Sequence, residues 1–318
     1  MKKLRNLVEK NNMNIISSYP DFCVVNIEME AELDAFFKKE LWGISEFSFP
    51  NLFFDSTKYS YQVSRFSEKT IIISGIDPIR KNDLNKNLSF FSIVGEIPLK
   101  DVVQELFDHF DYWKNVPLEY KEWYENNLSQ NNFRFIEDRD NFDYLYFRED
   151  LANLSGKALH KKKNLVNFFM NNYSVQVKPL DIYTIEDARA ILLSWKNTRS
   201  SDLSSDFEEC SLALDFFEQL HLNGIIVYAD GSPVGFSLGE FLQENRMFVV
   251  LFEKGISSYK GVYQFTNCSQ ARSLSSSVKL INREQDLGDE GLRQAKMTYR
   301  PCDFVRKHLI VPAEYSFN

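Results

Sequence analysis

The sequence is poor in the residues that build disulfide frameworks, metal centres and membrane spans. It has four cysteines and four histidines among 318 residues. The cysteines lie far apart without a Cys-x-x-Cys pair, and the histidines are isolated, so neither a disulfide framework nor a metal site is expected. No stretch approaches the ~18 consecutive apolar residues of a membrane-spanning helix. These absences predict a reduced, cytoplasmic protein with no metal and no integral membrane association.

Positive charge is also in deficit. The 45 acidic residues outnumber the 37 basic ones, which gives a formal net charge of −8. Because binding to nucleic-acid phosphates requires Lys and Arg, a broad DNA-binding face is not expected, although a local basic patch is still compatible with this charge. The length allows two domains, each with its own core. The 28 Phe and 15 Tyr predict that this core is rich in aromatic residues.

The C-terminal half alternates between strand and helix patterns. Its clearest signal is Asp230-Gly231 between two apolar runs, which is typical of a β-hairpin. The predicted order is strand, helix, helix, hairpin, strand, helix, strand, helix and strand. These elements are expected at residues 174–180, 185–195, 210–222, 225–239, 247–252, 263–273, 278–282, 289–299 and 304–311.

The N-terminal half mixes the two patterns as well. Alternating Phe47 and Phe49 predict an extended segment over residues 45–54. Strands are expected at 70–74, 90–94, 132–137 and 142–147, and helices at 30–39, 98–110 and, capped by Ser155, at about 155–171. We therefore predict an N-terminal domain over residues 1–172, ending in this last helix, and a C-terminal domain over residues 173–318.

The helix predicted at 155–171 is strongly basic. Lys157, His160, Lys161 and Asn164 have the spacing i, i+3, i+4 and i+7, which places them on one helical face. A basic face near a helix N-terminus can bind phosphate. The alternative is a solvated basic surface, the usual environment of Lys.

Two groups of acidic and amide side chains follow predicted strands. Glu253 comes at the end of the 247–252 run, where its carboxylate could accept a proton from a nucleophile. Its alternative role is an ion pair with Lys254 or Arg283.

The second group is Asn282, Glu284 and Asp286, which alternate along a run that we expect to be extended. Their side chains would then project to one side, at the end of a strand where α/β sheets bind substrates. Asp286 has an equally plausible alternative role as the cap of the helix that follows.

That last helix carries a cationic stripe. Arg293, Lys296 and Arg300 have the spacing i, i+3 and i+7. They could bind a donor phosphate, or they could pair with Asp289 and Glu290 at the surface. Surface pairs contribute only about 0–1 kcal/mol, so pairing alone explains the stripe poorly.

Residues 173–318 resemble a GNAT-type acyltransferase domain. In that fold the fourth strand splays from the fifth, the acyl donor enters the gap, and its phosphates meet the loop before the next helix. The resemblance implies that residues 247–253 form the splayed strand and 257–262 the phosphate loop, with Lys254, Lys260 and Gly261 at the donor.

This loop departs from the acetyl-CoA pattern. Acetyl-CoA users carry Gln or Arg, then two residues, Gly, one residue, and Gly or Ala. Here the corresponding positions are Ser258, Gly261 and Tyr263. Backbone amides are then less freely presented to a pyrophosphate, which leaves room for a donor other than CoA.

Four separated motifs carry a broader resemblance. They are SEFSFPNLF at 45–53, DL, LSGK and HKKKN between 150 and 164, FEK and KGVYQ between 252 and 264, and NREQDLG, GLR and AK between 282 and 296. From about residue 20 onward the chain resembles a bacterial family related to the C-terminal domain of phosphatidylglycerol lysyltransferase. The resemblance implies an α/β (α+β) fold with two GNAT-like acyltransferase domains in tandem, each a mixed, largely antiparallel sheet flanked by helices.

The expected function is therefore an N-acyltransferase or aminoacyltransferase. It would use acyl-CoA or aminoacyl-tRNA as a co-substrate, with no tightly bound cofactor, and would act on an amine or hydroxyl acceptor. The alternative is a non-catalytic GNAT-like module that binds a phosphorylated metabolite or an RNA end. A peripheral enzyme acting on lipid head groups is least favoured, because a net charge of −8 opposes anionic bilayers. The sequence does not determine the oligomeric state.

Overall fold

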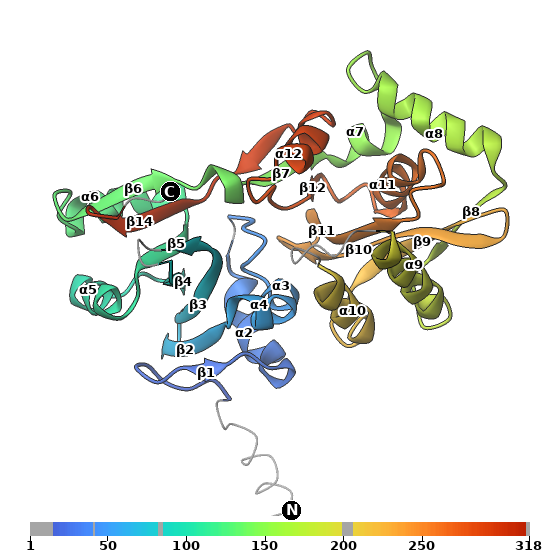
Figure 1. Cartoon of the computed structure of the whole chain (residues 1–318). Helices are drawn as coiled ribbons and strands as arrows, with labels where there is room; N and C mark the ends of the chain where they lie inside the picture. The colour runs from blue at the N-terminus through green and yellow to red at the C-terminus, as the bar shows by residue number, and fades with distance from the viewer. Residues whose placement is uncertain (1–14, 41, 82–84, 199–205, 316–318) are drawn as a thin grey trace, which may run out of the picture. The chain divides into compact units, whose positions relative to one another are not determined.

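The computed structural model describes residues 15–40, 42–81, 85–198 and 206–315 (Figure 1). The chain divides into two compact units. Unit 1 comprises the described residues within 1–40, 47–136 and 308–318, and unit 2 those within 41–46 and 137–307. Among these described ranges, no helix is both long enough and apolar enough to cross a bilayer.

This division differs from the one drawn at residue 172 from the sequence. Residues 137–172 group with unit 2, as do residues 42–46, while the described C-terminal residues from His308 onward group with unit 1. The chain therefore passes from one unit to the other several times, at 40/41, 46/47, 136/137 and 307/308. A boundary of this kind leaves no linker composition in the sequence.

Unit 1 contains a seven-stranded sheet in the order β1-β2-β3-β4-β5-β14-β6. The pairs β1–β2, β2–β3, β3–β4 and β5–β14 are antiparallel, and the pair β4–β5 is parallel. Its core is aromatic: Phe90, Phe91, Tyr112 and Trp113 are fully buried, as the composition predicted. The strands are β1 (Cys23–Val24), β2 (Gln62–Ser67), β3 (Thr70–Lys81), β4 (Asn87–Gly95), β5 (Tyr112–Val116), β6 (Phe133–Glu137) and β14 (His308–Pro312). The helices are η1 (Ile27–Met29), α2 (Glu30–Phe37), α3 (Phe49–Phe54), α4 (Ser56–Tyr59), α5 (Lys100–His109), η2 (Leu118–Tyr120) and α6 (Lys121–Asn127).

The extended segment predicted at 45–54 is wrong for its second part, which forms α3. The Ser48 side chain accepts a hydrogen bond from the Asn51 amide at 3.3 Å, and Pro50 lies in the first turn. Both features favour the start of a helix. Phe49 and Phe53 then stack at i and i+4, with ring centroids 5.7 Å apart. The Phe alternation was a weaker signal than the capping residues.

Unit 2 contains a second seven-stranded sheet in the order β13-β7-β12-β11-β10-β9-β8. The predicted hairpin is confirmed, because β9 and β10 pair antiparallel around Asp230 and Gly231, which both have positive φ. Figure 1 shows α11 on one face of this sheet and α9 and α10 on the other. The strands are β7 (Asp143–Phe147), β8 (Val175–Pro179), β9 (Asn223–Ala229), β10 (Ser232–Leu242), β11 (Met247–Gly255), β12 (Leu280–Asn282) and β13 (Asp303–Val305). The helices are η3 (Arg139–Asn141), α7 (Arg148–Asn153), α8 (His160–Asn172), α9 (Ile185–Asn197), α10 (Phe207–Asp215), α11 (Val262–Ser273) and α12 (Glu290–Met297).

The two sheets share one topology. In each sheet, one strand near the edge comes from a part of the chain far from its neighbours in sequence. In unit 1, β14 lies between β5 and β6, and in unit 2, β7 lies between β12 and β13. The single strand predicted at 304–311 is therefore wrong, since β13 and β14 belong to different sheets. The expected fold class is confirmed: each unit is a mixed, largely antiparallel sheet flanked by helices.

The sheet of unit 1 should depend on β14. The side chain of Ile310 in this strand is fully buried. We expect Ile310→Ala to destabilise unit 1 by about 2–5 kcal/mol, because a large core side chain is deleted, and amide hydrogen exchange should accelerate in β5 and β6. The matched control is Ile79→Ala, whose side chain is 61% exposed and which should change stability by less than about 0.5 kcal/mol. Acceleration confined to unit 2 would contradict the strand assignment.

Candidate active site

Strands β11 and β12 diverge in unit 2. They pair in parallel from Met247–Leu280 to Val249–Asn282. β12 ends there, whereas β11 continues to Gly255 and stays paired with β10. Counted along the sheet from β8, these are the fourth and fifth strands, between which the GNAT resemblance implies a splay.

An ion pair crosses this divergence. The Arg283 guanidinium, which follows β12, lies 3.2 Å from the Glu253 carboxylate on β11. Asn267 of α11 also donates to Glu253, at 3.3 Å. The guanidinium lies over the Tyr299 ring, 5.2 Å from its centroid. Burial opposes the charge of Arg283, but Glu253 offsets it, so the pKa of Arg283 is raised overall.

Glu253 therefore pairs with Arg283 and not with Lys254. Successive residues of a strand face opposite sides of a sheet, and Lys254 points toward α9. Its ammonium lies 2.6 Å from the Asp206 carboxylate and 4.2 Å from the centroid of the Trp195 ring. Lys254 is thus separated from Glu253 by the sheet itself.

The sheet-facing side of α11 is polar beside Glu253. Ser237 lies directly opposite Glu253 in the β10–β11 pairing. The oxygens of Ser237, Thr266, Asn267 and Gln270 are buried, and none has a hydrogen-bond partner within the described ranges. Buried polar atoms in native proteins are nearly always satisfied, so such atoms mark places for water or ligand.

A lysine absent from the sequence-based site lies close by. Lys162 of α8 is half-buried, and its ammonium lies 4.3 Å from the centroid of the Tyr299 ring. Burial, and to a smaller extent the Arg283 charge, lower the pKa of Lys162. Two cations thus share the Tyr299 side chain, and Arg283 alone of the two is paired with Glu253.

The basic cluster predicted on one helix is divided by the structure. Leu154 and Gly156 both have positive φ, so the helix predicted from Ser155 is interrupted and α8 begins only at His160. Lys157 consequently lies outside the helix. Lys157, His160 and Lys161 are exposed.

The loop before α11 is shaped by α8. Gly261 has φ +93°, and a Cβ there would lie 2.5 Å from the Leu165 carbonyl oxygen. Gly261 is therefore required by close contact with α8, whatever the loop binds. The neighbouring Lys260 is exposed, and its ammonium lies 4.7 Å from the centroid of the Phe168 ring.

Asn282 is enclosed by main chain and by a buried acid. Its amide donates to the Gly43 carbonyl at 3.2 Å and to Asp143 at 3.1 Å, and its oxygen accepts from the Glu284 amide at 2.7 Å. The run that follows is not extended, because Glu284 and Leu287 have φ near +50°. The prediction that Asn282, Glu284 and Asp286 project to one side is therefore wrong.

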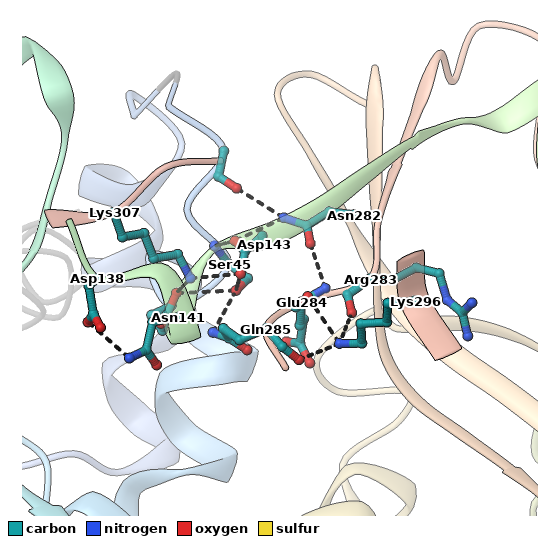
Figure 2. Close-up of polar contacts among 12 residues, drawn as sticks. Ser45, Asp138, Asn141, Asp143, Asn282, Arg283, Glu284, Gln285, Lys296 and Lys307 are labelled. Carbon is teal, nitrogen blue, oxygen red and sulfur yellow. Dashed lines mark hydrogen bonds and ion pairs between the residues drawn. The ribbon is translucent and has the colours of Figure 1, made fainter. Parts of the chain in front are cut away.

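Behind Asn282 is a buried charge cluster (Figure 2). Lys307 donates to Asp143 at 2.7 Å and to Glu46, and Ser45 donates to Asp143 through its amide at 2.9 Å and its hydroxyl at 3.1 Å. Lys307 and Asp143 are fully buried. Burial is the main reason that the pKa of Asp143 is raised, although Lys307 opposes that change.

Asp286 is the acceptor of a separate cluster. Arg293 donates to it at 2.9 and 2.7 Å, and the Tyr144 hydroxyl at 2.5 Å. Burial alone would raise the pKa of Asp286, but these bonds and one from the Gly288 amide lower it to about 2. The side chain that caps α12 is Asp289.

Lys296 of α12 lies against the turn that follows β12. It is 9% exposed, and its ammonium donates to the carbonyls of Arg283 at 2.7 Å, Glu284 at 3.1 Å and Gln285. Figure 2 shows the side chain pointing at these main-chain oxygens. Burial lowers the pKa of Lys296 to about 8. Arg293 and Lys296 are thus both engaged by acceptors within unit 2.

The family model "Phosphatidylglycerol lysyltransferase, C-terminal" matches residues 42–311. The chain belongs to this family. A curated relative, an uncharacterised protein of Mycoplasmoides gallisepticum, is 26% identical over 176 residues, which are 53% of this chain and 55% of that protein. The chain thus spans about half the length of the curated relative it matches.

Solved structures show where this family member lies among known folds. A conserved protein of unknown function from Bacteroides thetaiotaomicron is 27% identical with a TM-score of 0.78, over 92% of this chain and 99% of that one. L-PGS from Bacillus licheniformis has 14% identity and a TM-score of 0.59, over 96% and 95%. FemX has 10% identity and a TM-score of 0.53, over 91% and 96%. The last two likenesses show the fold.

In this phosphatidylglycerol lysyltransferase C-terminal family member, the sequence-based site is partly assembled. Glu253 lies at the divergence, whereas Asn282, Glu284, Asp286, Arg293 and Lys296 belong to the loop and clusters behind β12. Sequence reasoning missed Lys162, Asn267 and Tyr299. Lys162 precedes the buried residues Val166 and Phe169 by i+4 and i+7, so a helix correctly started at His160 would have placed it on the inner face.

Lys307 should be essential to unit 2. We expect Lys307→Met to destabilise it by about 3–5 kcal/mol at pH 7, because two buried carboxylates lose their counter-ion. Urea unfolding, with hydrogen exchange to assign the change to unit 2, measures this. Adding Glu46→Gln and Asp143→Asn should recover part of the loss, and Lys279→Met, at an exposed position, should be neutral. A neutral Lys307→Met would refute the role of this cluster.

Asp286 should confer a pH-dependent stability. Its native pKa of about 2 lies below the ordinary value of 3.8, so it stabilises the fold above about pH 4 and loses this effect as the pH falls toward 2. We expect Asp286→Asn to be about 1.5–3 kcal/mol less stable than wild type at pH 7, with the difference shrinking between pH 4 and 2. Asp289→Asn, which keeps a good capping residue, should behave like wild type. A stability difference between wild type and Asp286→Asn that does not change with pH would contradict a role for the Asp286 charge.

Proposed function

We propose that this chain is a transferase that moves an acyl or aminoacyl group to an amine or hydroxyl acceptor. The donor in this proposal is a CoA thioester or an aminoacyl-tRNA, and the site lies in unit 2. Membership of the phosphatidylglycerol lysyltransferase C-terminal family supports the transfer chemistry. The fold shared with L-PGS and FemX is consistent with it.

The observation that carries the proposal is the carboxylate at the divergence of β11 and β12. Glu253 is held by Arg283 and Asn267 beside the end of a short parallel pairing. A carboxylate so fixed can accept a proton without reorganising. The buried oxygens beside it that lack a hydrogen-bond partner within the described ranges, those of Ser237, Thr266, Asn267 and Gln270, are available to a polar substrate.

The proposed reaction assigns one role to each group. The acceptor nitrogen or oxygen attacks the donor carbonyl carbon, forming a C–N or C–O bond, and its proton passes to Glu253. The C–S bond of a thioester or the C–O bond of an ester breaks, and the leaving thiolate or alkoxide takes up the proton that Glu253 accepted, which returns Glu253 to its carboxylate form. Asn267 and Arg283 orient the carboxylate.

The donor's phosphates are assigned to the basic side chains that remain exposed. Lys157, His160, Lys161 and Lys260 are accessible to a ligand, unlike Lys254, Arg293 and Lys296, which are engaged internally. The contact between Gly261 and α8 adds to the departure of the loop from the acetyl-CoA pattern. An aminoacyl ester is therefore the donor to test first.

The second candidate is a non-catalytic module that binds a phosphorylated metabolite or an RNA end. The same exposed basic side chains favour it, because a chain with net charge −8 still gathers them around α8. It differs from the first candidate in requiring no base. Binding of unacylated ligands without turnover is its signature.

The two candidate functions differ in whether they require Glu253 as a base. Transfer assays with aminoacyl-tRNA, acetyl-CoA and other acyl-CoAs, with calorimetry for binding, should find one donor that is turned over. We expect Glu253→Gln to lower kcat by about 10²–10⁴-fold, the usual contribution of a general base. Because Arg283 loses its counter-ion in this variant, its thermal unfolding is measured first and the transfer assays are run well below that transition. Glu244→Gln is the matched control, since its side chain is 86% exposed. Binding without turnover by the wild type would favour the module.

A further inference from the structure

Lys296 is buried in an unusual way for a lysine. Its ammonium donates to the carbonyl oxygens of the consecutive residues Arg283, Glu284 and Gln285. Within the described ranges, no carboxylate oxygen pairs with it at ion-pair distance. A buried charge is costly unless it is compensated. Here the compensation comes from the main chain.

The three carbonyls belong to the turn that leaves β12. Glu284 has φ +53°, a conformation that side-chain-bearing residues rarely adopt without support. On the other side of the turn, the Arg283 amide donates to the Tyr144 carbonyl at 2.9 Å, and the Tyr144 amide donates to the Glu284 carbonyl at 3.2 Å. Lys296 and β7 therefore hold the same turn.

The course of this turn determines where Arg283 points. Arg283 supplies both a carbonyl to Lys296, at 2.7 Å, and a guanidinium to Glu253, at 3.2 Å. A shift of the turn would move the guanidinium relative to β11. Displacements of about 1 Å are enough to impair a reacting geometry.

An ammonium suits these acceptors better than any other side chain. It carries three N–H donors on one atom, which matches three oxygens converging on it. The charges of Glu284, Arg283, Asp143 and Asp286 act on the ammonium, the carboxylates favouring its charged form and Arg283 opposing it. The ammonium also lies over the Tyr144 ring, 5.6 Å from its centroid.

We propose that Lys296 is a positioning residue of the transfer site, which acts by fixing the turn at 283–285 and so holding Arg283 against Glu253. The inference rests on the proposed function for its consequence in catalysis. The mechanical part, an ammonium that orders the turn, stands on the geometry of unit 2 alone. It differs from the phosphate-binding role predicted for Lys296 from the sequence.

The test removes the ammonium and returns it in solution. In Lys296→Ala, amide hydrogen exchange should rise about tenfold or more at 283–288, as expected from the loss of hydrogen bonds to a charged donor, and should rise less in α9 and unit 1. Adding n-propylammonium, which replaces the deleted atoms, should restore protection. The neutral analogue n-propanol should not. Lys296→Met, which keeps the packing, should resemble the alanine variant.

A purely structural role predicts different results. If packing is what matters, Lys296→Met restores protection and n-propylammonium does not, which would overturn the proposal. Unchanged exchange at 283–288 in Lys296→Ala, or an equal rise throughout unit 2, would also overturn it. Should the alanine variant fail to fold, folding with n-propylammonium but not with n-propanol is the expected result. Failure with both is a further outcome that contradicts it.

The catalytic consequence is measured separately. With the donor found for the wild type, Lys296→Ala should lower kcat, n-propylammonium should recover it, and KM should change less. Because the exchange experiment uses no donor, an inactive wild type refutes the proposed function and leaves the positioning test intact. Rescued exchange without rescued kcat would overturn the link between the turn and catalysis.

Discussion

The contact between Glu253 and Arg283 is the one on which the candidate site depends. Strands β11 and β12 pair over a short distance only, and this contact joins them where pairing has ended. A hydrogen-bonded ion pair has a defined geometry. It therefore fixes two polar side chains at the place where the backbone hydrogen bonds between β11 and β12 end. The two segments are thus joined by side chains and not by the main chain, and the Glu253 carboxylate lies at this place.

Much of unit 2 around this contact is organised by buried charge. Lys307 neutralises Asp143 and Glu46, Arg293 binds Asp286, and Lys296 binds main-chain carbonyls. Buried charges add little net stability compared with apolar packing. Their partners, however, are specific. Lys307 joins segments that are distant in the sequence, whereas Lys296 and the Arg293–Asp286 pair fix the turn between β12 and α12.

The two units have the same strand topology but different side chains beside their fourth and fifth strands. In unit 1 the fourth and fifth strands also pair in parallel, through Phe90–Tyr112 and Phe91–Trp113. There Trp113 and Tyr120 pack with ring centroids 5.9 Å apart, and the Tyr120 hydroxyl bonds the carbonyl of Gly95, at the end of β4. Tyr120 thus packs at the end of β4, whereas the fourth strand of unit 2, β11, carries Glu253 in contact with Arg283 and Asn267. This contrast supports unit 2 as the site of the proposed chemistry.

Local features could be predicted from the sequence alone: the Asp230-Gly231 hairpin, most of the order of strands and helices in the C-terminal half, the aromatic core and the position of Glu253 near the end of a strand. Periodicity and turn chemistry are local, and the family motifs are contiguous. The partners of the polar side chains that follow β12 could be seen only in the folded chain, because Asp286 accepts from Tyr144 and Asn282 donates to Gly43 and Asp143, all of them far away in the sequence. The tertiary structure also decided that β7 and β14 each cross to the other sheet, since strand pairing depends on long-range contacts that no local pattern records.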